Sequence, residues 1–239
     1  MNRKRPADIK KAKDAAEKIE EKIQRELSNK ERELADWAPK TALGKQVKNG
    51  TITTIDEIFS KGYKIREPEI VDSLLQIVEE VVDTAKTTRV VRAGRKFSFR
   101  VTVLVGNKDG YLGVGTGKDV DRFPAINKAK RDAKLNLVKI YRGSGSWEEQ
   151  PTNDRHSIPF KVTGQSGSVR VNLMPAPKGT GLAVGHNIRK VMEFAGIQNV
   201  WGKAKGNSGN TLNFVRAAIN ALEQTGKVKL SKDVLRKIK

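Results

Sequence analysis

The stretch that decides the fold is FSFRVTVLV, residues 97–105, in which apolar side chains alternate with polar or basic ones. Successive side chains of a β-strand point to opposite faces, so this period of two predicts a half-buried strand with one apolar and one basic face. The turn sequence NKDG follows at 107–110, and YLGVGTG at 111–117 returns as the partner strand. The stretch therefore predicts an antiparallel hairpin inside a globular domain.

Helical patterns flank this hairpin on both sides. Upstream, the apolar residues of 70–82 predict an amphipathic helix, and 89–92 predicts a further short strand. Downstream, Pro124 suits the first turn of a second helix. The inner face of that helix would consist of Ile126, Ala129, Ala133 and Leu137. The order helix, three strands, helix matches the outline of the double-stranded RNA-binding fold over residues 68–140.

A second pattern of strands and helices follows a linker at 141–155 that is rich in glycine, serine and proline. Strands are predicted at 157–163, 168–173 and 200–201. Of two predicted helices, the first would bury Ile188, Val191, Met192 and Ala195, and the second Leu212, Val215, Ala218, Ile219 and Leu222. These elements predict a βαβ-type domain over 156–226, with a basic tail at 227–239.

The first 67 residues predict an extension of a different character. A three-four spacing of apolar residues predicts one long helix over 7–34, whereas 37–67 predicts an irregular segment with short local structure. The expected fold class is therefore α+β. It comprises an N-terminal helical extension (1–67), an αβββα domain (68–140) and, after the linker, the βαβ-type second domain.

The chain of 239 residues is strongly basic, with 47 Lys and Arg against 27 Asp and Glu and a formal net charge of +20. Half of this excess lies in residues 141–239, which hold 16 basic and 6 acidic side chains. A field of this sign attracts polyanions, and phosphate contacts make binding strongly dependent on salt. The charge favours a nucleic acid as partner, and an acidic membrane surface is the alternative that charge alone leaves open.

The sequence lacks the residues that several kinds of catalytic, metal-binding or nucleotide-binding site require. The absence of cysteine excludes disulfides, thiolate metal sites and cysteine nucleophiles. His156 and His186 have no further metal ligand at a suitable spacing, and no Gly-x-Ser-x-Gly elbow precedes a helix. The run at 112–118 is not a P-loop, because Leu112 stands at the required first glycine and Asp119 follows the lysine. No catalytic residue, metal ion or cofactor is expected, and the glycines of this run mark a strand that a helix or an RNA backbone approaches closely.

The sequence also contains no signal for a membrane or for secretion. No apolar stretch approaches the roughly 18 residues that a membrane span needs. The charged N-terminus lacks the apolar segment of a secretory signal. These features predict a soluble, intracellular protein.

Two groups of basic residues are the main candidate RNA contacts. Residues 89–100 hold five basic side chains and no acid, on and beside a strand that would hold the charges in a row. The run KAKGNSGN at 203–210 precedes a helix, where free backbone N–H groups suit a phosphate, although a plain capping loop is the alternative. The residues predicted to bind RNA are Arg89, Arg92, Arg95, Lys96, Arg100, Lys118, Lys128, Arg131, Lys178, Lys203, Lys205 and Asn207.

From about residue 70 to 225, a collinear series of motifs resembles the family of the universal fifth protein of the small ribosomal subunit. In the first domain they are GRKFSF (94–99), VGNKDGYLGVG (105–115) and AINKA (125–129). In the second they are VTGQSGSV (162–169), PAPKGTG (175–181), AGIQNV (195–200), KGN (205–207) and NFVRA (213–217). The motif PAP at 175–177 and the long N-terminal extension resemble the archaeal and eukaryotic branch of the family. The lack of Arg-Gly repeats near the N-terminus favours the archaeal branch.

This resemblance implies a first domain of the double-stranded RNA-binding type and a second, left-handed βαβ-like domain. It implies a cytoplasmic, ribosome-bound structural constituent of the small subunit, which binds small-subunit ribosomal RNA near the mRNA entrance and supports translational accuracy. The implied partners are that RNA, mRNA at the entry channel, and the third, fourth and eighth proteins of the same subunit. The family has no catalytic residues, and the loop that matches 89–96 approaches the head–neck region of the RNA.

Two other classes of function are weighed against this one. A non-ribosomal RNA-binding or RNA-processing subunit could use the same second fold. RNA cleavage, however, would need grouped carboxylates for magnesium, and the six acids of 141–239 are scattered. A small-molecule kinase would need a longer phosphate loop than GTG at 179–181, together with an acidic base.

Overall fold

The structure is a computed structural model, and it describes residues 34, 36–144 and 155–227. The helix predicted over 7–34, except Leu34, and the basic tail, except Lys227, lie outside these described residues. In the segment from residue 36 onward, the first sheet is preceded by the short helices α2 (Ala42–Lys48), α3 (Ile55–Ser60) and α4 (Pro68–Leu74). Pro68 occupies the first turn of α4, where its missing N–H costs no helical hydrogen bond.

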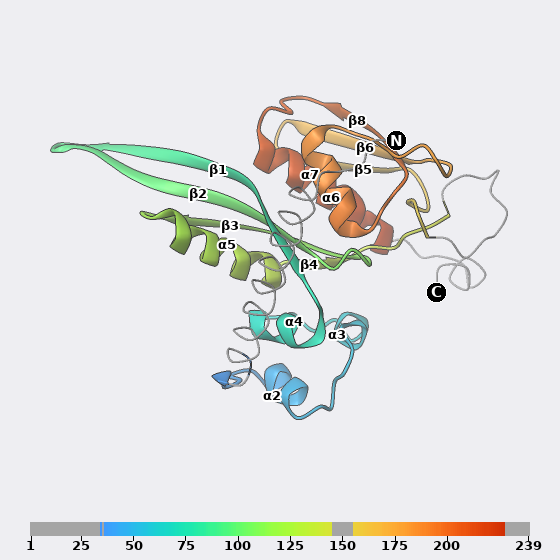
Figure 1. The fold of residues 1–239 in the computed structure, drawn as a ribbon, viewed down its shortest axis with the longest axis horizontal. Helices are drawn as coiled ribbons and strands as arrows, with labels where there is room; N and C mark the ends of the chain where they lie inside the picture. The colour runs from blue at the N-terminus through green and yellow to red at the C-terminus, as the bar shows by residue number, and fades with distance from the viewer. Residues whose placement is uncertain (1–33, 35, 145–154, 228–239) are drawn as a thin grey trace, which may run out of the picture.

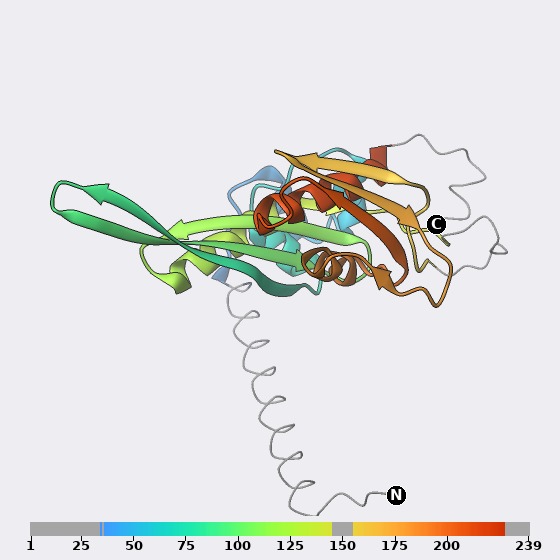
Figure 2. The ribbon, with the colours of Figure 1, turned by 90° about the horizontal axis from the view of Figure 1, so that it is seen from above.

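The first sheet is built around the predicted hairpin. Its strands are β1 (Val78–Val91), β2 (Gly94–Gly106), β3 (Tyr111–Asp119) and β4 (Leu137–Lys139), all antiparallel and in that order. Helix α5 (Arg122–Leu135) connects β3 to β4. The predicted order of helix, three strands and helix is therefore confirmed, with one short strand added. Beyond the end of β3, strands β1 and β2 continue as a two-stranded projection (Figures 1 and 2).

The helix predicted over residues 70–82 is wrong beyond Leu74. Residues 78–83 belong to β1, and the strand predicted at 89–92 is the far end of the same strand. The apolar residues do not alternate here because β1 is covered on both faces. Val81 packs with the cluster around α5, and Val82 packs with the second domain across a β-bulge.

Helix α5 packs on the first sheet through a row of alanines. Ala125, Ala129 and Ala133 are fully buried, whereas Ile126 is only half-buried. Leu137, predicted on the same helix, lies in β4 instead. The predicted inner face is thus correct at its two alanines, and Ile126 is only half-buried because the short distance between helix and sheet admits only small side chains. Leu137 is buried in the same cluster but lies beyond the end of the helix at Leu135.

The second sheet has the strand order β5-β6-β8-β7. The bounds are Val162–Ser166 (β5), Val169–Pro175 (β6), Leu182–Ala183 (β7) and Val200–Lys205 (β8), with α6 (His186–Ala195) between β7 and β8 and α7 (Thr211–Lys227) after β8. Strands β7 and β8 are parallel, so β7, α6 and β8 form the predicted βαβ unit. The strand predicted at 157–163 is displaced to β5, and 202–205, predicted as loop, extend β8. Of the residues predicted to face inward from the two helices, all are buried except Leu212, which is half-buried.

The two domains share one core. Helices α6 and α7 lie between the two sheets, and α5 covers the opposite face of the first sheet (Figure 1). Leu104 and Leu112 of the first sheet are buried in the same cluster as the apolar side chains of α6, α7 and β6. At the domain boundary, Lys108 N donates to Phe194 O at 3.0 Å and Gly110 N to Ala195 O at 3.2 Å. The second domain is therefore held against the first by both packing and backbone hydrogen bonds.

Residues 37–67 are folded onto the first domain. Ile52, Ile55, Ile58 and Ile65 are buried in the cluster that contains the α5 alanines. The Glu67 carboxylate accepts hydrogen bonds from Trp37 Nε1 at 3.0 Å, Lys40 N at 3.0 Å and Thr41 N at 2.6 Å. Burial opposes the ionisation of Glu67, but these donors outweigh it and hold its pKa below the usual range.

We expect Glu67 to make folding stability depend on acid pH. Because its folded pKa lies below its ordinary value of 4.5, its stabilisation is fully present above that value and is lost as the pH falls through the folded pKa. Glu67→Gln should be less stable than the wild type at pH 7 and should lose less stability on acidification. Urea unfolding of both proteins at pH 7, 5 and 3 measures this difference. Parallel pH profiles for the two proteins would contradict it.

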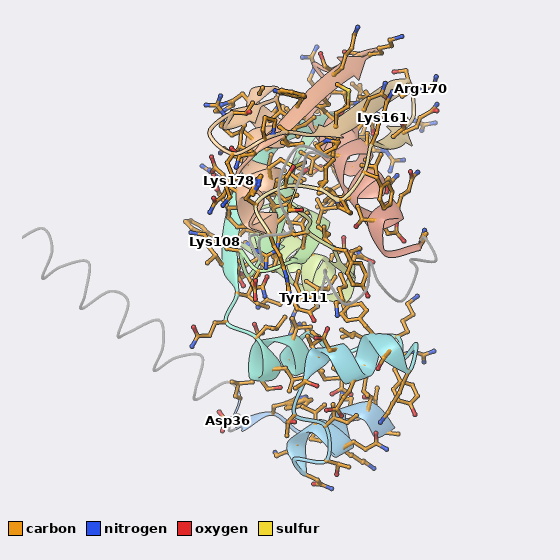
Figure 3. The ribbon with its side chains drawn as sticks, turned by 90° about the vertical axis from the view of Figure 1, so that its right-hand side faces the viewer. Asp36, Lys108, Tyr111, Lys161, Arg170 and Lys178 are labelled. Atoms are coloured by element: carbon orange, nitrogen blue, oxygen red, sulfur yellow. The ribbon has the colours of Figure 1, made fainter. Side chains whose placement is uncertain are left out.

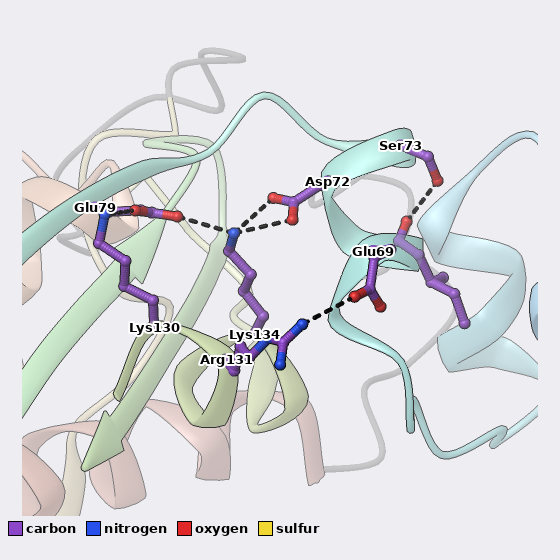
Figure 4. Close-up of polar contacts among 8 residues, drawn as sticks. Glu69, Asp72, Ser73, Glu79, Lys130, Arg131 and Lys134 are labelled. Carbon is purple, nitrogen blue, oxygen red and sulfur yellow. Dashed lines mark hydrogen bonds and ion pairs between the residues drawn. The ribbon is translucent and has the colours of Figure 1, made fainter. Parts of the chain in front are cut away.

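An ionic cluster ties α5 to β1 and α4 (Figure 4). Lys134 Nζ lies 2.8 Å from Asp72 Oδ1 and 2.9 Å from Glu79 Oε1, and Lys130 Nζ lies 2.7 Å from Glu79 Oε2. Burial opposes ionisation of both Lys134 and Glu79. Their mutual contacts outweigh it, so the pKa of Lys134 is raised and that of Glu79 is lowered. The cluster therefore stays charged at neutral pH.

Replacing Lys134 by methionine should destabilise the protein by about 1–3 kcal/mol, because it leaves two half-enclosed carboxylates without their shared cation. The matched control is Arg131→Met on the same helix. Its partner Glu69 is 3.6 Å away and its side chain is 72% exposed, so the expected loss is under about 0.5 kcal/mol. Urea unfolding at pH 7 compares the two variants, and equal losses would show that the cluster contributes nothing specific.

Candidate nucleic-acid interface

The projecting part of the first sheet, residues 86–100, carries six basic side chains and no acid, and we call it the hairpin arm. The pairing register places Arg89 directly opposite Lys96, and Arg100 directly opposite Lys118 of β3. Opposed residues, and residues two or four apart on one strand, share a face of a sheet. Arg89, Lys96, Arg100 and Lys118 therefore form one cationic row on the side that faces the second domain.

This cationic row is electrostatically unfavourable when nothing is bound to it. Like charges directly opposite each other destabilise a sheet. Within residues 36–144 and 155–227, no acid lies at ion-pair distance from these four cations. Arg100 Nε is enclosed and makes no hydrogen bond to any described residue. Phosphates along the row would relieve the repulsion and accept the guanidinium hydrogen bonds.

The other two arginines of the arm extend this surface. The register pairs Val91 with Gly94, so Arg92 lies in the connecting turn, where Gly94 has a positive φ of 125° that favours glycine. Arg95 lies opposite Val90, on the face that Arg89 and Lys96 do not share. All the basic residues from 89 to 96 are exposed. The arm thus presents cations on both faces and at its tip.

The structure brings the predicted loop of the second domain to the base of the arm. Thr211 Oγ1, at the start of α7, donates to Asp83 Oδ2 of β1 at 2.7 Å. Asp83 pairs with Thr102 and so lies on the same face of the first sheet as the cationic row. Lys205 and Asn207, which are exposed just before α7, therefore lie on the same side of that sheet as the cationic row.

The remaining predicted RNA contacts lie elsewhere. Lys128 and Arg131 belong to α5, on the opposite side of the first sheet, where they pair with Asp119 at 2.7 Å and Glu69 at 3.6 Å. Lys178 is exposed in the loop after β6 (Figure 3), and Lys203 is exposed on β8. The twelve predicted residues therefore do not form one continuous surface.

Sequence reasoning missed three exposed residues near these cations. Lys86 Nζ lies 4.0 Å from the ring centroid of Phe97, whose side chain is 47% exposed on the arm. Arg170 is exposed on β6. The signal for Arg170 was present, because it lies between the buried Val169 and Val171, and a residue between two buried strand positions faces outward.

The two histidines, which are possible metal ligands by residue type, do not belong to a metal site in the described residues. His156 is buried with its Nδ1 3.0 Å from Asn199 Nδ2, and His186 is exposed at the start of α6. No group of three metal-ligating side chains occurs among the described residues. In the same part of the chain, no helix has the length and apolar character needed to cross a membrane.

Comparison with known proteins gives the family. Residues 77–141 match the sequence model of the N-terminal domain of ribosomal protein S5, and residues 164–236 match that of its C-terminal domain. The chain belongs to the ribosomal protein S5 family. This family is structural and not enzymatic.

Archaeal members of the S5 family cover most of the chain. The small ribosomal subunit protein uS5 of Methanothermobacter thermautotrophicus is 49% identical over 206 residues, which are 86% of this chain and 95% of that protein. The protein of the same name from Methanothrix thermoacetophila is 50% identical over 194 residues, 81% of this chain and 95% of its own length. These relatives confirm the predicted family and its archaeal type. Residues 37–76 precede the matched S5 N-terminal domain and nonetheless complete its core through the isoleucines of 52–70.

Proposed function

We propose that the protein is a structural constituent of the small ribosomal subunit, bound to the ribosome in the cytoplasm, and that it binds small-subunit ribosomal RNA. The observation that carries this proposal is the cationic row of the hairpin arm, with two directly opposed pairs of like charge and no acidic partner among the described residues. The names of its archaeal relatives support the ribosomal assignment. The twelve predicted basic and polar residues, the arm above all, are the proposed RNA contacts.

Sedimentation through a sucrose gradient tests this role. Tagged protein expressed in an archaeal host should travel with the small subunit at physiological salt, because ribosomal RNA would hold it there. Concentrated salt should release the protein from the subunit, because salt weakens the contacts between its cations and the RNA phosphates. Tagged protein that stays at the top of the gradient, while RNA of another class copurifies with it, would favour a non-ribosomal RNA-binding protein instead.

We further propose that the protein lies near the mRNA entrance, beside the third, fourth and eighth proteins of the subunit, and that it supports accurate decoding. The shared core of its two domains supports this proposal, because a body that does not bend internally can fix the relative position of the RNA segments and proteins that it contacts. Accuracy would then depend on how the body biases an equilibrium between subunit conformations. A misreading assay on ribosomes with surface substitutions outside the arm tests it. Accuracy at the wild-type level in every viable variant would leave only a scaffolding role.

A further inference from the structure

The outer face of the second sheet is not covered by any helix that the structure describes. Helices α6 and α7 both pack on its inner face, against Val169, Val171 and Leu173. Strand residues between those buried positions therefore point away from the core. Figure 3 shows Lys161 and Arg170 near the end of the molecule farthest from α2 and α3.

The register orders this outer face into three cross-strand rows. The first row is Gln165, Arg170 and Lys205; the second is Thr163, Asn172 and Lys203; the third is Met174 and Trp201. Arg170 also donates to Gln165 Oε1 at 3.2 Å, which holds its guanidinium on the face. Side chains two apart on a strand are separated by roughly 6.7 Å, so the three rows span roughly 13 Å.

The charge on this face is of one sign. Residues 155–227 contain ten basic side chains and only two acids, Glu193 and Glu223, and both acids lie on α6 and α7. Strands β5, β6, β7 and β8 contain no acid at all. Arg170, Lys203 and Lys205 are exposed on the face with no neutralising acid on its strands. The charge of the face is therefore complementary to a polyanion.

An exposed aromatic side chain completes the outer face. Trp201 is 43% exposed, and it lies opposite Met174 beside the row that contains Lys203. Exposed aromatic side chains on a sheet, next to cations, are the arrangement by which proteins stack unpaired bases and follow the phosphates between them. Protein interfaces have a different composition, since lysine is depleted from them and their cores are apolar. Only two apolar side chains, Met174 and Trp201, are in the three rows.

We propose that the outer face of the second sheet binds a short stretch of unpaired RNA, with one base stacked on Trp201 and phosphates along Lys203, Lys205 and Arg170. The span of the rows accommodates two or three nucleotides, the number that other RNA-binding sheets stack. The inference rests on the proposed RNA-binding function and adds a second site with a different preference, which shares Lys205 with the loop near the base of the hairpin arm. The arm bears mainly cations, whereas this face would recognise bases that are not paired.

Binding of two RNA probes to the full-length protein tests the inference. The probes are a fluorescein-labelled 10-nucleotide RNA without internal pairing and a 16-base-pair RNA duplex. Trp201→Ala should weaken binding of the unpaired probe by about 5- to 150-fold, which corresponds to one lost stacking contact, and should leave duplex binding unchanged. Trp201→Phe should retain most of the affinity. Lys203→Gln with Lys205→Gln should lower the salt slope for the unpaired probe by about 1.4.

Tryptophan fluorescence gives a second measurement that a mere folding defect would not reproduce. Addition of the unpaired RNA should quench the emission of the wild type, and the quenching should be largely lost in Trp201→Phe, which keeps an aromatic ring at that position. Equal affinity of the wild type and Trp201→Ala for the unpaired probe, with no change in emission, would overturn the inference. So would a Trp201→Ala defect that is seen only when neighbouring ribosomal proteins are added, since the face would then bind protein.

The proposed function can fail separately from this inference. A triple substitution of Arg89, Arg92 and Arg95 that weakens duplex binding, combined with a silent Trp201→Ala, supports the ribosomal RNA role and rejects the second site. The opposite outcome is that the arm substitutions leave duplex binding unaffected while Trp201→Ala abolishes binding of the unpaired probe. That outcome supports the second site and rejects the arm as an RNA-binding surface.

Discussion

Replacing Gly115 by alanine is expected to destabilise the protein by at least about 2 kcal/mol, which is a fall in melting temperature of roughly 4–8 °C for a chain of this size. A Cβ at position 115 would lie 2.1 Å from Ala133 N and 2.2 Å from Ala129 O. Because both contacts are with the backbone of α5, no side-chain rearrangement relieves them, and the whole helix must move away from the sheet. Thermal unfolding followed by circular dichroism measures the loss.

Gly209→Ala is the matched control for Gly115→Ala. Gly209 lies in the exposed loop before α7, and a Cβ there would meet only the side-chain oxygen of Asn207, at 3.3 Å. We expect this control to change stability by less than about 0.5 kcal/mol. Because the domains share a core, Gly115→Ala should also lower the melting temperature of the second domain, in one transition. A small loss equal to that of the control would mean that α5 does not lie as close to β3 as the structure has it.

The glycines of β3 also show which parts of the fold the sequence could predict. A strict period of two identified the strand around residues 97–105, and helical spacing identified the buried faces of α6 and α7. Periodicity failed at residues 78–83, because each face of the strand carries a valine and an acid. Glu79 and Val81 share one face, and Glu80 and Val82 share the other, so apolar and polar residues do not alternate. Periodicity also failed at 37–67. Ile52, Ile55, Ile58 and Ile65 are buried there, but the helices and turns that carry them are too short to show a repeating apolar spacing.

The candidate site was predictable as a set of residues but not as a geometry. The basic run at 89–100 was evident from composition, and its residues are exposed or half-buried on the arm. The opposition of Arg89 to Lys96 depends on where the chain turns, and Gly94, which permits a tight turn, does not by itself fix which residues are paired. The position of Lys205 and Asn207 on the same side of the first sheet depends on packing between domains, which local sequence does not encode.

Replacing Arg89, Arg92 and Arg95 together by glutamine should weaken RNA binding and flatten its dependence on salt. Each lost phosphate contact lowers the slope of log K against log salt by about 0.9 on a duplex, so three contacts lower it by about 2.7. Between 50 and 200 mM salt, the wild type should therefore lose roughly 40-fold more affinity than the variant. Filter binding of a small-subunit ribosomal RNA fragment across this range measures both slopes.

The control removes the same charge from another part of the surface. Lys45, Lys61 and Lys64 are exposed in the N-terminal segment, and their replacement by glutamine lowers the net charge by the same three units. If only the net charge of the chain attracts RNA, both triple variants should lose affinity equally. If phosphates bind along the arm, the slope should fall in the arm variant alone. An unchanged slope in the arm variant would remove the arm from the interface.

Folding cannot account for the expected loss of binding in the arm variant. Arg89 lies directly opposite Lys96, so the neutral glutamine removes a repulsion between like charges that the free protein otherwise bears. The arm variant should consequently be at least as stable as the wild type in urea while it binds RNA more weakly. A gain in stability together with a loss of affinity is expected when residues bind a ligand but destabilise the protein without it. A destabilised arm variant would instead mean that these arginines stabilise the hairpin itself.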